Sequence, residues 1–126
     1  MPPSPFQYAI LRVVPDVERG ECVNAGVVLF CRQRRFLEVR VELDEARVRA
    51  LAPDADIGAV HGHLDALVRI AHGDPGAGPI AALPASERFH WLVATSSTII
   101  QASPEHTGLS DDPAAELEHL MDRLVR

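Results

Sequence analysis

Residues Val27–Phe30 constrain the fold of this chain more than any other segment, because they are continuously apolar. A short apolar run without alternation is typical of a β-strand whose two faces are both covered. We therefore expect a central strand, within the apolar segment that begins at Val23, with other parts of the chain packed on either side. Asn24 and Gly26 lie near its start, and a glycine in this position indicates a bulge or a close backbone approach.

Two further segments have the composition of strands. Tyr8–Val14 is a short β-rich run that ends before Pro15, a residue with no backbone N–H to donate to a sheet. Phe36–Glu42 alternates apolar and charged residues, which is the pattern of an edge strand or of a strand with one exposed face. Residues 32–35 connect this strand to the central one as a hairpin. The first third of the chain therefore predicts an antiparallel three-stranded meander.

Helical periodicity replaces the β pattern in the middle of the chain. Asp44 is placed to cap a short helix that reaches Leu51, and Asp54 or Asp56 is placed to cap a second helix. The apolar residues of the second helix recur at spacings of three and four, which predicts one buried face: they are Ile57, Val60, Leu64, Leu67, Val68 and Ala71.

Three more elements are expected before the end of the chain. A helix begins near Pro84 and continues through Trp91, and residues 98–102 form a fourth strand. Asp112 followed by Pro113 marks the start of a last helix. The predicted fold class is α+β: a mostly antiparallel sheet of about four strands, made of the N-terminal three-stranded meander plus one later strand, covered by helices.

We expect a single domain that spans residues 1–126, a length within the usual size of one domain. Residues 1–6 are expected to be a flexible N-terminus. The glycine- and proline-rich residues 73–79 are expected to be the mobile loop of the chain.

Charge and cysteine usage exclude several classes of function. The chain has 12 cationic residues, all arginine, against 18 acidic ones, and its net charge is −6. Binding to nucleic acid or to an anionic membrane surface depends on a cationic face, so neither partner is expected. No apolar run approaches the roughly 20 residues that cross a bilayer, and the N-terminus lacks the pattern of a signal peptide.

Cys22 and Cys31 bracket the central strand. A strand between them is about 30 Å long at ~3.3 Å per residue, whereas a disulfide needs Cα atoms within about 7 Å. We therefore expect two free thiols in a reducing compartment and a cytoplasmic protein.

Neither a metal centre nor a cofactor site is predicted. His61, Asp65 and His72 project from one side of the second helix, and imidazole and carboxylate groups are ligands for divalent transition metals. However, the two histidines are about 16 Å apart along the helix axis, at 1.5 Å per residue. One ion cannot bridge that distance.

The segment from residue 88 to residue 112 has the greatest density of side chains with potential chemistry. Ser103, His106 and Asp111 are the residue types of a nucleophilic triad, but no strand–turn–helix motif exposes the serine. Two other interpretations remain open. In one, Asp111 and Asp112 cap a helix while residues 106–107 order the loop before it. In the other, a polar pocket between the fourth strand and the helices is formed by His90, Gln101 and His106.

Two long, ordered motifs carry a resemblance that covers nearly the whole chain, from about Tyr8 to Leu124. The first consists of Tyr8-Ala9-Ile10, Arg12-Val13-Val14-Pro15, Glu21 and the run from Asn24 to Phe30. The second consists of the run from Arg88 to Ala94, Thr98-Ile99-Ile100-Gln101, Ser103-Pro104, His106-Thr107-Gly108-Leu109 and Asp111-Asp112-Pro113. Together they resemble the bacterial family catalogued as domain of unknown function 3037.

The resemblance implies a function only in outline, because this family has no established activity. Similar proteins are small stand-alone bacterial domains that are often encoded beside a HipA-like kinase, which implies such a kinase as a partner. The polar residues that recur in the family's motifs imply candidate ligand- or partner-binding positions: Arg12, Asn24, Arg88, His90, Gln101, His106 and Thr107.

The leading hypothesis is an uncharacterised, non-catalytic accessory or interaction protein, a partner or regulator of a HipA-like kinase. Phe89 and Trp91 are two positions apart on a predicted helix and cannot both face the core. One of them is therefore expected to be exposed, and exposed aromatic side chains often anchor interfaces. Trp91 joins the candidate binding residues for this reason.

The alternative is a small enzyme or binding protein for a phosphorylated or nucleotide-like ligand. Arg12 and Arg88 would hold the anion, and His90 or His106 would transfer protons. This alternative requires the four side chains to converge in one concave pocket. A homodimer formed through an uncovered sheet edge is compatible with both hypotheses.

Overall fold

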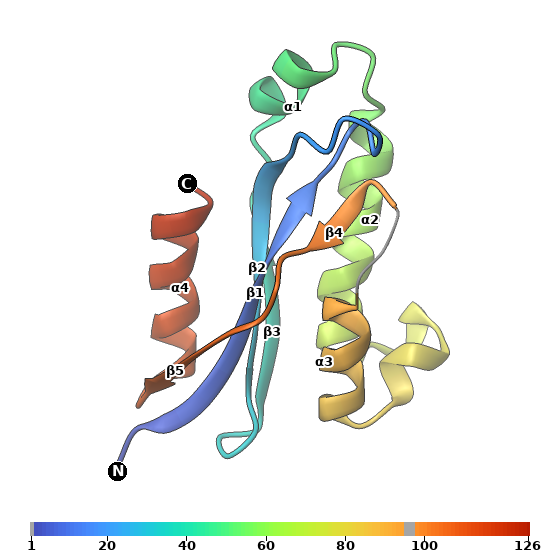
Figure 1. Cartoon of the computed structure of the whole chain (residues 1–126). Helices are drawn as coiled ribbons and strands as arrows, with labels where there is room; N and C mark the ends of the chain where they lie inside the picture. The colour runs from blue at the N-terminus through green and yellow to red at the C-terminus, as the bar shows by residue number, and fades with distance from the viewer. Residues whose placement is uncertain (1, 95–97) are drawn as a thin grey trace.

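A computed structural model describes residues 2–94 and 98–126, and in this part of the chain an antiparallel five-stranded sheet lies between two layers of helices (Figure 1). The predicted α+β class and the predicted N-terminal meander are confirmed. The elements are, in chain order, β1 Ser4–Val13, β2 Val23–Cys31, β3 Phe36–Val41, α1 Glu45–Leu51, α2 Ile57–Ala71, the short 3₁₀ turns Pro75–Ala77 and Pro79–Ala82, α3 Ala85–Val93, β4 Ile100–Ala102, β5 His106–Ser110 and α4 Pro113–Leu124. None of the described helices combines the length and the apolar character needed to traverse a bilayer.

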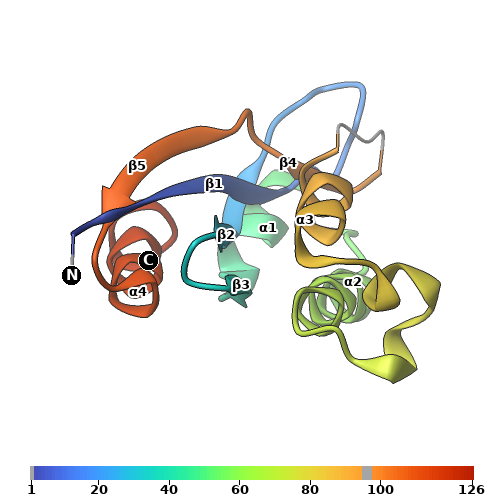
Figure 2. The same ribbon diagram turned by 90° about the horizontal axis from the view of Figure 1, so that it is seen from below.

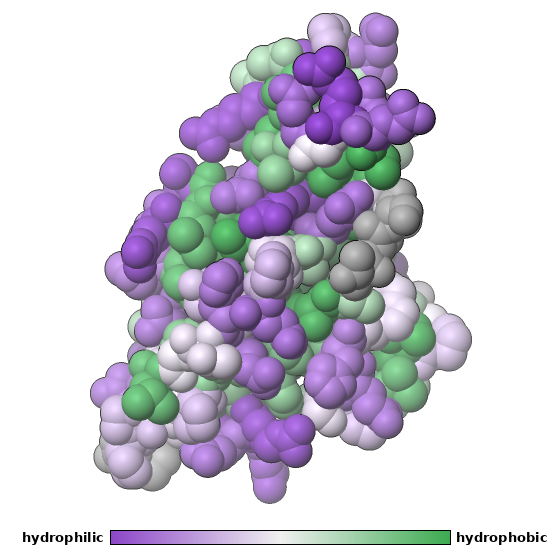
Figure 3. Space-filling model, viewed as in Figure 1, coloured by the Kyte–Doolittle hydropathy of each residue, from purple (hydrophilic) through white to green (hydrophobic). Residues whose placement is uncertain are grey.

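The sheet has the order β3-β2-β1, and both β4 and β5 pair with the far side of β1. Helix α4 covers one face, whereas α2 and α3 cover the other (Figure 2). Each face therefore has its own apolar core. At the lower left of Figure 3, where β5 ends, a hydrophobic patch remains exposed.

Strand β2 is buried on both faces, as its sequence predicts. Val27, Leu29 and Cys31 are inaccessible to solvent and pack in the core under α4. Val28 and Phe30 alternate with them and pack in the core under α2 and α3. Both cysteines are free thiols, as predicted, with Cys31 buried and Cys22 exposed.

The predicted bulge lies at the start of β2. Leu11 pairs with Gly26 and Arg12 pairs with Asn24, so Ala25 is an extra residue in β2. A Cβ atom on Gly26 would lie 2.7 Å from the carbonyl oxygen of Arg40 in the neighbouring strand β3. Glycine is therefore needed here for the close approach of two backbones.

The sheet has one strand more than the sequence indicates, because residues 106–110 form β5 rather than a loop. Ser103 makes this possible: the Ile10 N–H donates to its Oγ over 2.8 Å, and its own N–H donates to the Ile10 carbonyl over 2.8 Å. Pro104 follows and has no N–H to pair. The chain thus bends away after β4 and returns to β1 as β5.

Both segments that the sequence predicts to be flexible contain regular structure. At the N-terminus, Ser4 begins β1 and Phe6 is buried against α4. The glycine- and proline-rich residues 73–79 contain the turn Pro75–Ala77, and the Asp74 carboxylate caps it by accepting from the Gly76 N–H over 2.9 Å.

Asp112 and Asp111 provide a matched test of the start of α4. The Asp112 carboxylate accepts a hydrogen bond from the Ala115 N–H over 3.1 Å, whereas Asp111 is exposed and caps nothing in the structure. We expect Asp112→Ala to lower the free energy of unfolding in urea by about 1 kcal/mol. Asp111→Ala is expected to change it by less than about 0.5 kcal/mol. Equal losses in the two variants would contradict the assignment of the cap.

Candidate functional site

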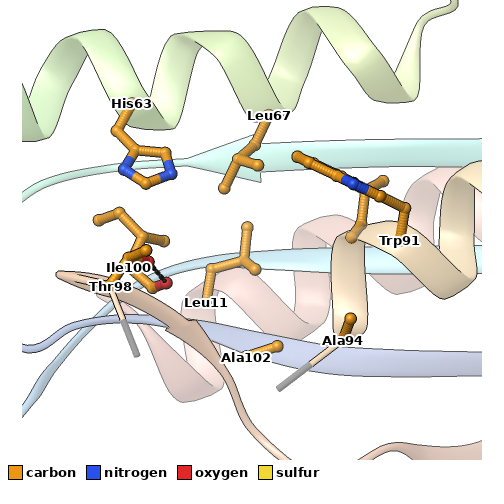
Figure 4. A pocket seen from close by; sticks show the side chains of 9 residues that line it. Leu11, His63, Leu67, Trp91, Ala94, Thr98, Ile100 and Ala102 are labelled. Atoms are coloured by element: carbon orange, nitrogen blue, oxygen red, sulfur yellow. Dashed lines mark hydrogen bonds between the residues drawn. The ribbon is translucent and has the colours of Figure 1, made fainter. Parts of the chain in front are cut away.

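A surface hollow of about 300 Å³ lies between α2, α3 and the sheet (Figure 4). Its floor is apolar and comes from β1 and β4, its roof comes from α2, and Trp91 of α3 stands at one end. The described residues that line it are Leu11, His63, Leu67, Trp91, Leu92, Ala94, Thr98, Ile100 and Ala102. The volume is at the lower end of the range for small-molecule sites.

Trp91 is the exposed aromatic residue that the sequence predicts. Its side chain is 44% exposed, whereas Phe89 is fully buried and stacks on Phe30. Residues two apart on a helix point in nearly opposite directions, so burial of Phe89 in the core turns Trp91 outward to the rim of the hollow. It is also the single tryptophan of the chain.

His63 lines the hollow and is not among the binding residues that the sequence predicts. In Figure 4 its imidazole extends from α2 toward Ile100 of β4. A signal for this position exists, since His63 lies three residues after Val60 and four before Leu67, on the apolar stripe of α2. A half-buried histidine on such a stripe faces the part of the sheet that the helix covers, which here is the hollow over β1 and β4.

The described lining of the hollow is mainly apolar. Among its described lining residues, His63 is the one with a titratable side chain. The Thr98 hydroxyl donates to the Ile100 carbonyl over 2.8 Å. The hollow can therefore accept an apolar group, while the imidazole and the indole N–H can form hydrogen bonds to a polar group at the rim.

Three of the sequence-predicted candidates form a row on the opposite face of the sheet. Arg12 pairs in register with Asn24 on one side and with Gln101 on the other. Arg12 alternates with Leu11 and Val13, which face α2 and α3, so the row faces the α4 side. The Asn24 amide donates to the Leu124 carbonyl at the end of α4 over 3.0 Å.

His106 and Thr107 belong to β5 and point to opposite faces of the sheet. The His106 ring lies 5.2 Å, centroid to centroid, from that of Tyr8, its partner in register. Tyr8 and Arg12 are four positions apart along β1, so the Tyr8–His106 pair lies about 14 Å from the row of Arg12 at ~3.4 Å per residue.

Arg88 and His90 lie on α3, in the helical layer on the other side of the sheet. The Arg88 guanidinium donates to the carbonyls of Leu83, over 2.7 Å, and Ala71, over 3.4 Å. It thereby joins the end of α2 to the start of α3. His90 is exposed, and its ring centroid lies 6.3 Å from that of Phe89.

The four side chains of the enzyme hypothesis therefore do not share a pocket. Arg12 and His106 face the α4 side of the sheet, whereas Arg88 and His90 belong to a helix on its other side. A hollow does lie between the fourth strand and the helices. However, Gln101 is turned away from it, since it alternates with Ile100 and Ala102, which line it.

The triad and metal hypotheses find no support in the geometry. The Ser103 hydroxyl is buried and bonded to backbone groups, accepting from Ile10 and donating to the Pro104 carbonyl over 2.9 Å. His61 lies 3.6 Å from Glu45, and His72 lies 4.0 Å from Glu38. Within residues 2–94 and 98–126, no three His, Cys, Asp or Glu side chains are grouped as metal ligands.

A known protein family matches the sequence over a range that includes both motifs. The family model described as protein of unknown function (DUF3037) matches residues 8–125. The chain belongs to the DUF3037 family. Comparisons with curated proteins and with solved structures find no match.

The structure gives structural roles to several polar motif residues of this DUF3037 protein. Asn24 holds the end of α4, Arg88 joins α2 to α3, and Ser103 shapes the sheet edge. Trp91, by contrast, contributes exposed aromatic surface at the rim of a hollow. Among the candidate residues, Trp91 is therefore the one whose exposed aromatic side chain lies beside the hollow.

Arg88→Lys tests whether this arginine is a structural clamp. A lysine ammonium cannot reproduce the guanidinium fork that reaches both carbonyl groups. We expect the free energy of unfolding in urea to fall by about 1–2 kcal/mol. Arg123→Lys is the control, since Arg123 is exposed and makes no described hydrogen bond. Wild-type stability of Arg88→Lys would return Arg88 to the candidate ligand-binding residues.

Proposed function

We propose that this DUF3037 protein is an accessory interaction protein that binds a HipA-like kinase through the surface around Trp91. The observation that carries the proposal is a large aromatic side chain, 44% exposed, at the rim of an apolar hollow. The identity of the partner rests on the neighbourhood in which similar proteins are encoded.

The surface has the composition of a binding centre. Tryptophan is among the residues that contribute most to interfaces, particularly beside a desolvated pocket. Burial of one Leu-, Phe- or Met-sized side chain of the partner in the hollow is worth about 1.5–3 kcal/mol. The His63 imidazole and the indole N–H can then orient a polar group of the partner at the rim.

A non-catalytic role is consistent with the separation of the candidate acid–base and anion-holding groups. Arg12 and His90 lie on different sides of the sheet. An enzyme needs its reacting groups within hydrogen-bond reach of one substrate. A binding protein has no such requirement, because one continuous exposed surface is sufficient.

Trp91→Ala tests the proposal directly. We expect it to weaken binding to a purified HipA-like kinase from the same organism by about 30-fold, the effect of losing an interface residue worth about 2 kcal/mol. Isothermal titration calorimetry measures the affinity. Leu51→Ala is the matched control, because Leu51 is an apolar side chain, 37% exposed, on α1 rather than at the hollow. The Leu51→Ala variant is expected to bind the kinase with the affinity of the wild type.

Two results would contradict the proposal at different points. Equal affinities of the wild type and Trp91→Ala would show that the kinase binds another surface. Absence of binding by the folded wild-type protein would show that the kinase is not the partner. Self-association is a separate proposal, since it uses a different part of the molecule, the outer edge of β5.

A further inference from the structure

We propose that the protein forms a twofold-symmetric dimer in which β5 pairs antiparallel with β5 of a second copy, centred on Gly108. Within the described residues, β5 pairs with β1 on one side and with no strand on the other. This inference does not depend on the proposed kinase interaction, because Trp91 and β5 lie on different surfaces.

The backbone groups of Thr107 and Leu109 point to the free edge. Both the N–H and the C=O of Ile10 bond to Ser103, on the β4 and β5 side of β1. Backbone direction alternates along a strand, so Tyr8 and Phe6 also direct their polar groups to β5. The backbone N–H and C=O groups of their register partners, His106 and Gly108, therefore face β1, and those of Thr107 and Leu109 face outward.

The side chains of these two residues also form one surface. Leu109 is 68% exposed, the most exposed of the large hydrophobic side chains that the structure describes. Thr107 lies on the same face of β5 and lines a second hollow of about 340 Å³, which is mainly apolar. The other residues lining this hollow are Pro5, Phe6, Gln7, Phe30, Arg32 and Gln33.

Pairing about Gly108 makes this surface complementary to itself. In that register Leu109 of one copy lies opposite Thr107 of the other, on the same face, and each pair exchanges its outward N–H and C=O groups. Each Leu109 then meets the rim of the partner's hollow. A twofold axis satisfies both contacts at once, which favours a second copy over an unrelated strand.

The opposite edge of the sheet, β3, is protected against pairing in a way that β5 is not. Charged residues protect edge strands against pairing. Strand β3 carries Glu38 and Arg40, whereas β5 reads His-Thr-Gly-Leu-Ser and contains no Asp, Glu, Lys or Arg. The proposed register places His106 opposite Ser110, so it brings no like charges together within the strand. The exposed patch over the end of β5 is visible in Figure 3.

Sedimentation equilibrium of the full chain tests the dimer. We expect the wild type to have twice the monomer mass, and Leu109→Arg and Thr107→Pro to raise the dimer dissociation constant at least 100-fold. Proline at position 107 removes an outward N–H that β1 does not use, so the monomer is expected to keep its circular dichroism spectrum. Val17→Arg is the control, since Val17 is 45% exposed on the β1–β2 connection and should leave the mass unchanged.

A monomeric wild type overturns the proposal, as does a dimer that persists in Leu109→Arg. Were Thr107→Pro to unfold, Leu109→Arg with its matched control would still decide the matter. Cross-linking under oxidation tests the register in a Cys22→Ser background. The double variant Thr107→Cys/Leu109→Cys is expected to form an intermolecular disulfide, and Leu109→Cys alone is not. A disulfide in the single variant would overturn the Gly108-centred register.

Discussion

Burial of β2 on both faces is the constraint on which the rest of the structure depends. Val27–Cys31 contribute apolar side chains alternately to two cores, so the sheet needs a helical layer on each side. The chain meets this need from two places, with α2 and α3 from its middle and α4 from its end. Two hydrogen bonds attach α4 to the N-terminal strands: Asn24 of β2 donates to its last turn, and Arg40 of β3 donates to Glu118. Hydrogen bonds from Arg126 and Arg40 hold the pKa of the Glu118 carboxyl below its ordinary range.

The same constraint explains why polar motif residues are scattered over the molecule. Hydrogen-bonding side chains connect the two helical layers to the sheet and to one another, and each of these connections lies at a different place. Arg88 joins two helices, Asn24 holds a third, and Ser103 redirects the edge of the sheet. Residues that recur together in a motif therefore need not share a site. The proposed binding surface, at the rim of the hollow around Trp91, lies apart from these connecting residues.

The sequence predicts the elements with strong local signals and misses those that depend on a neighbour. The bulge at Gly26 and the exposure of one of the two aromatic residues Phe89 and Trp91 follow from local patterns. Strand β5 has no such pattern, since His-Thr-Gly-Leu-Ser is neither apolar nor alternating, and it becomes a strand through pairing with β1. His63 was missed because its importance comes from what α2 covers, although its place on the apolar stripe was a usable signal.

The sequence by itself determined the central strand, the meander around it and the amphipathic helices, because periodicity acts over a few neighbouring positions. Only the tertiary structure decided which candidate side chains meet. Arg12 and Gln101 come together although distant in the chain, because their strands are neighbours in register. His90 and His106 are separated because His106 faces the α4 side of the sheet, whereas His90 belongs to α3 on its other side. Such distances depend on how layers pack, and no local pattern encodes them.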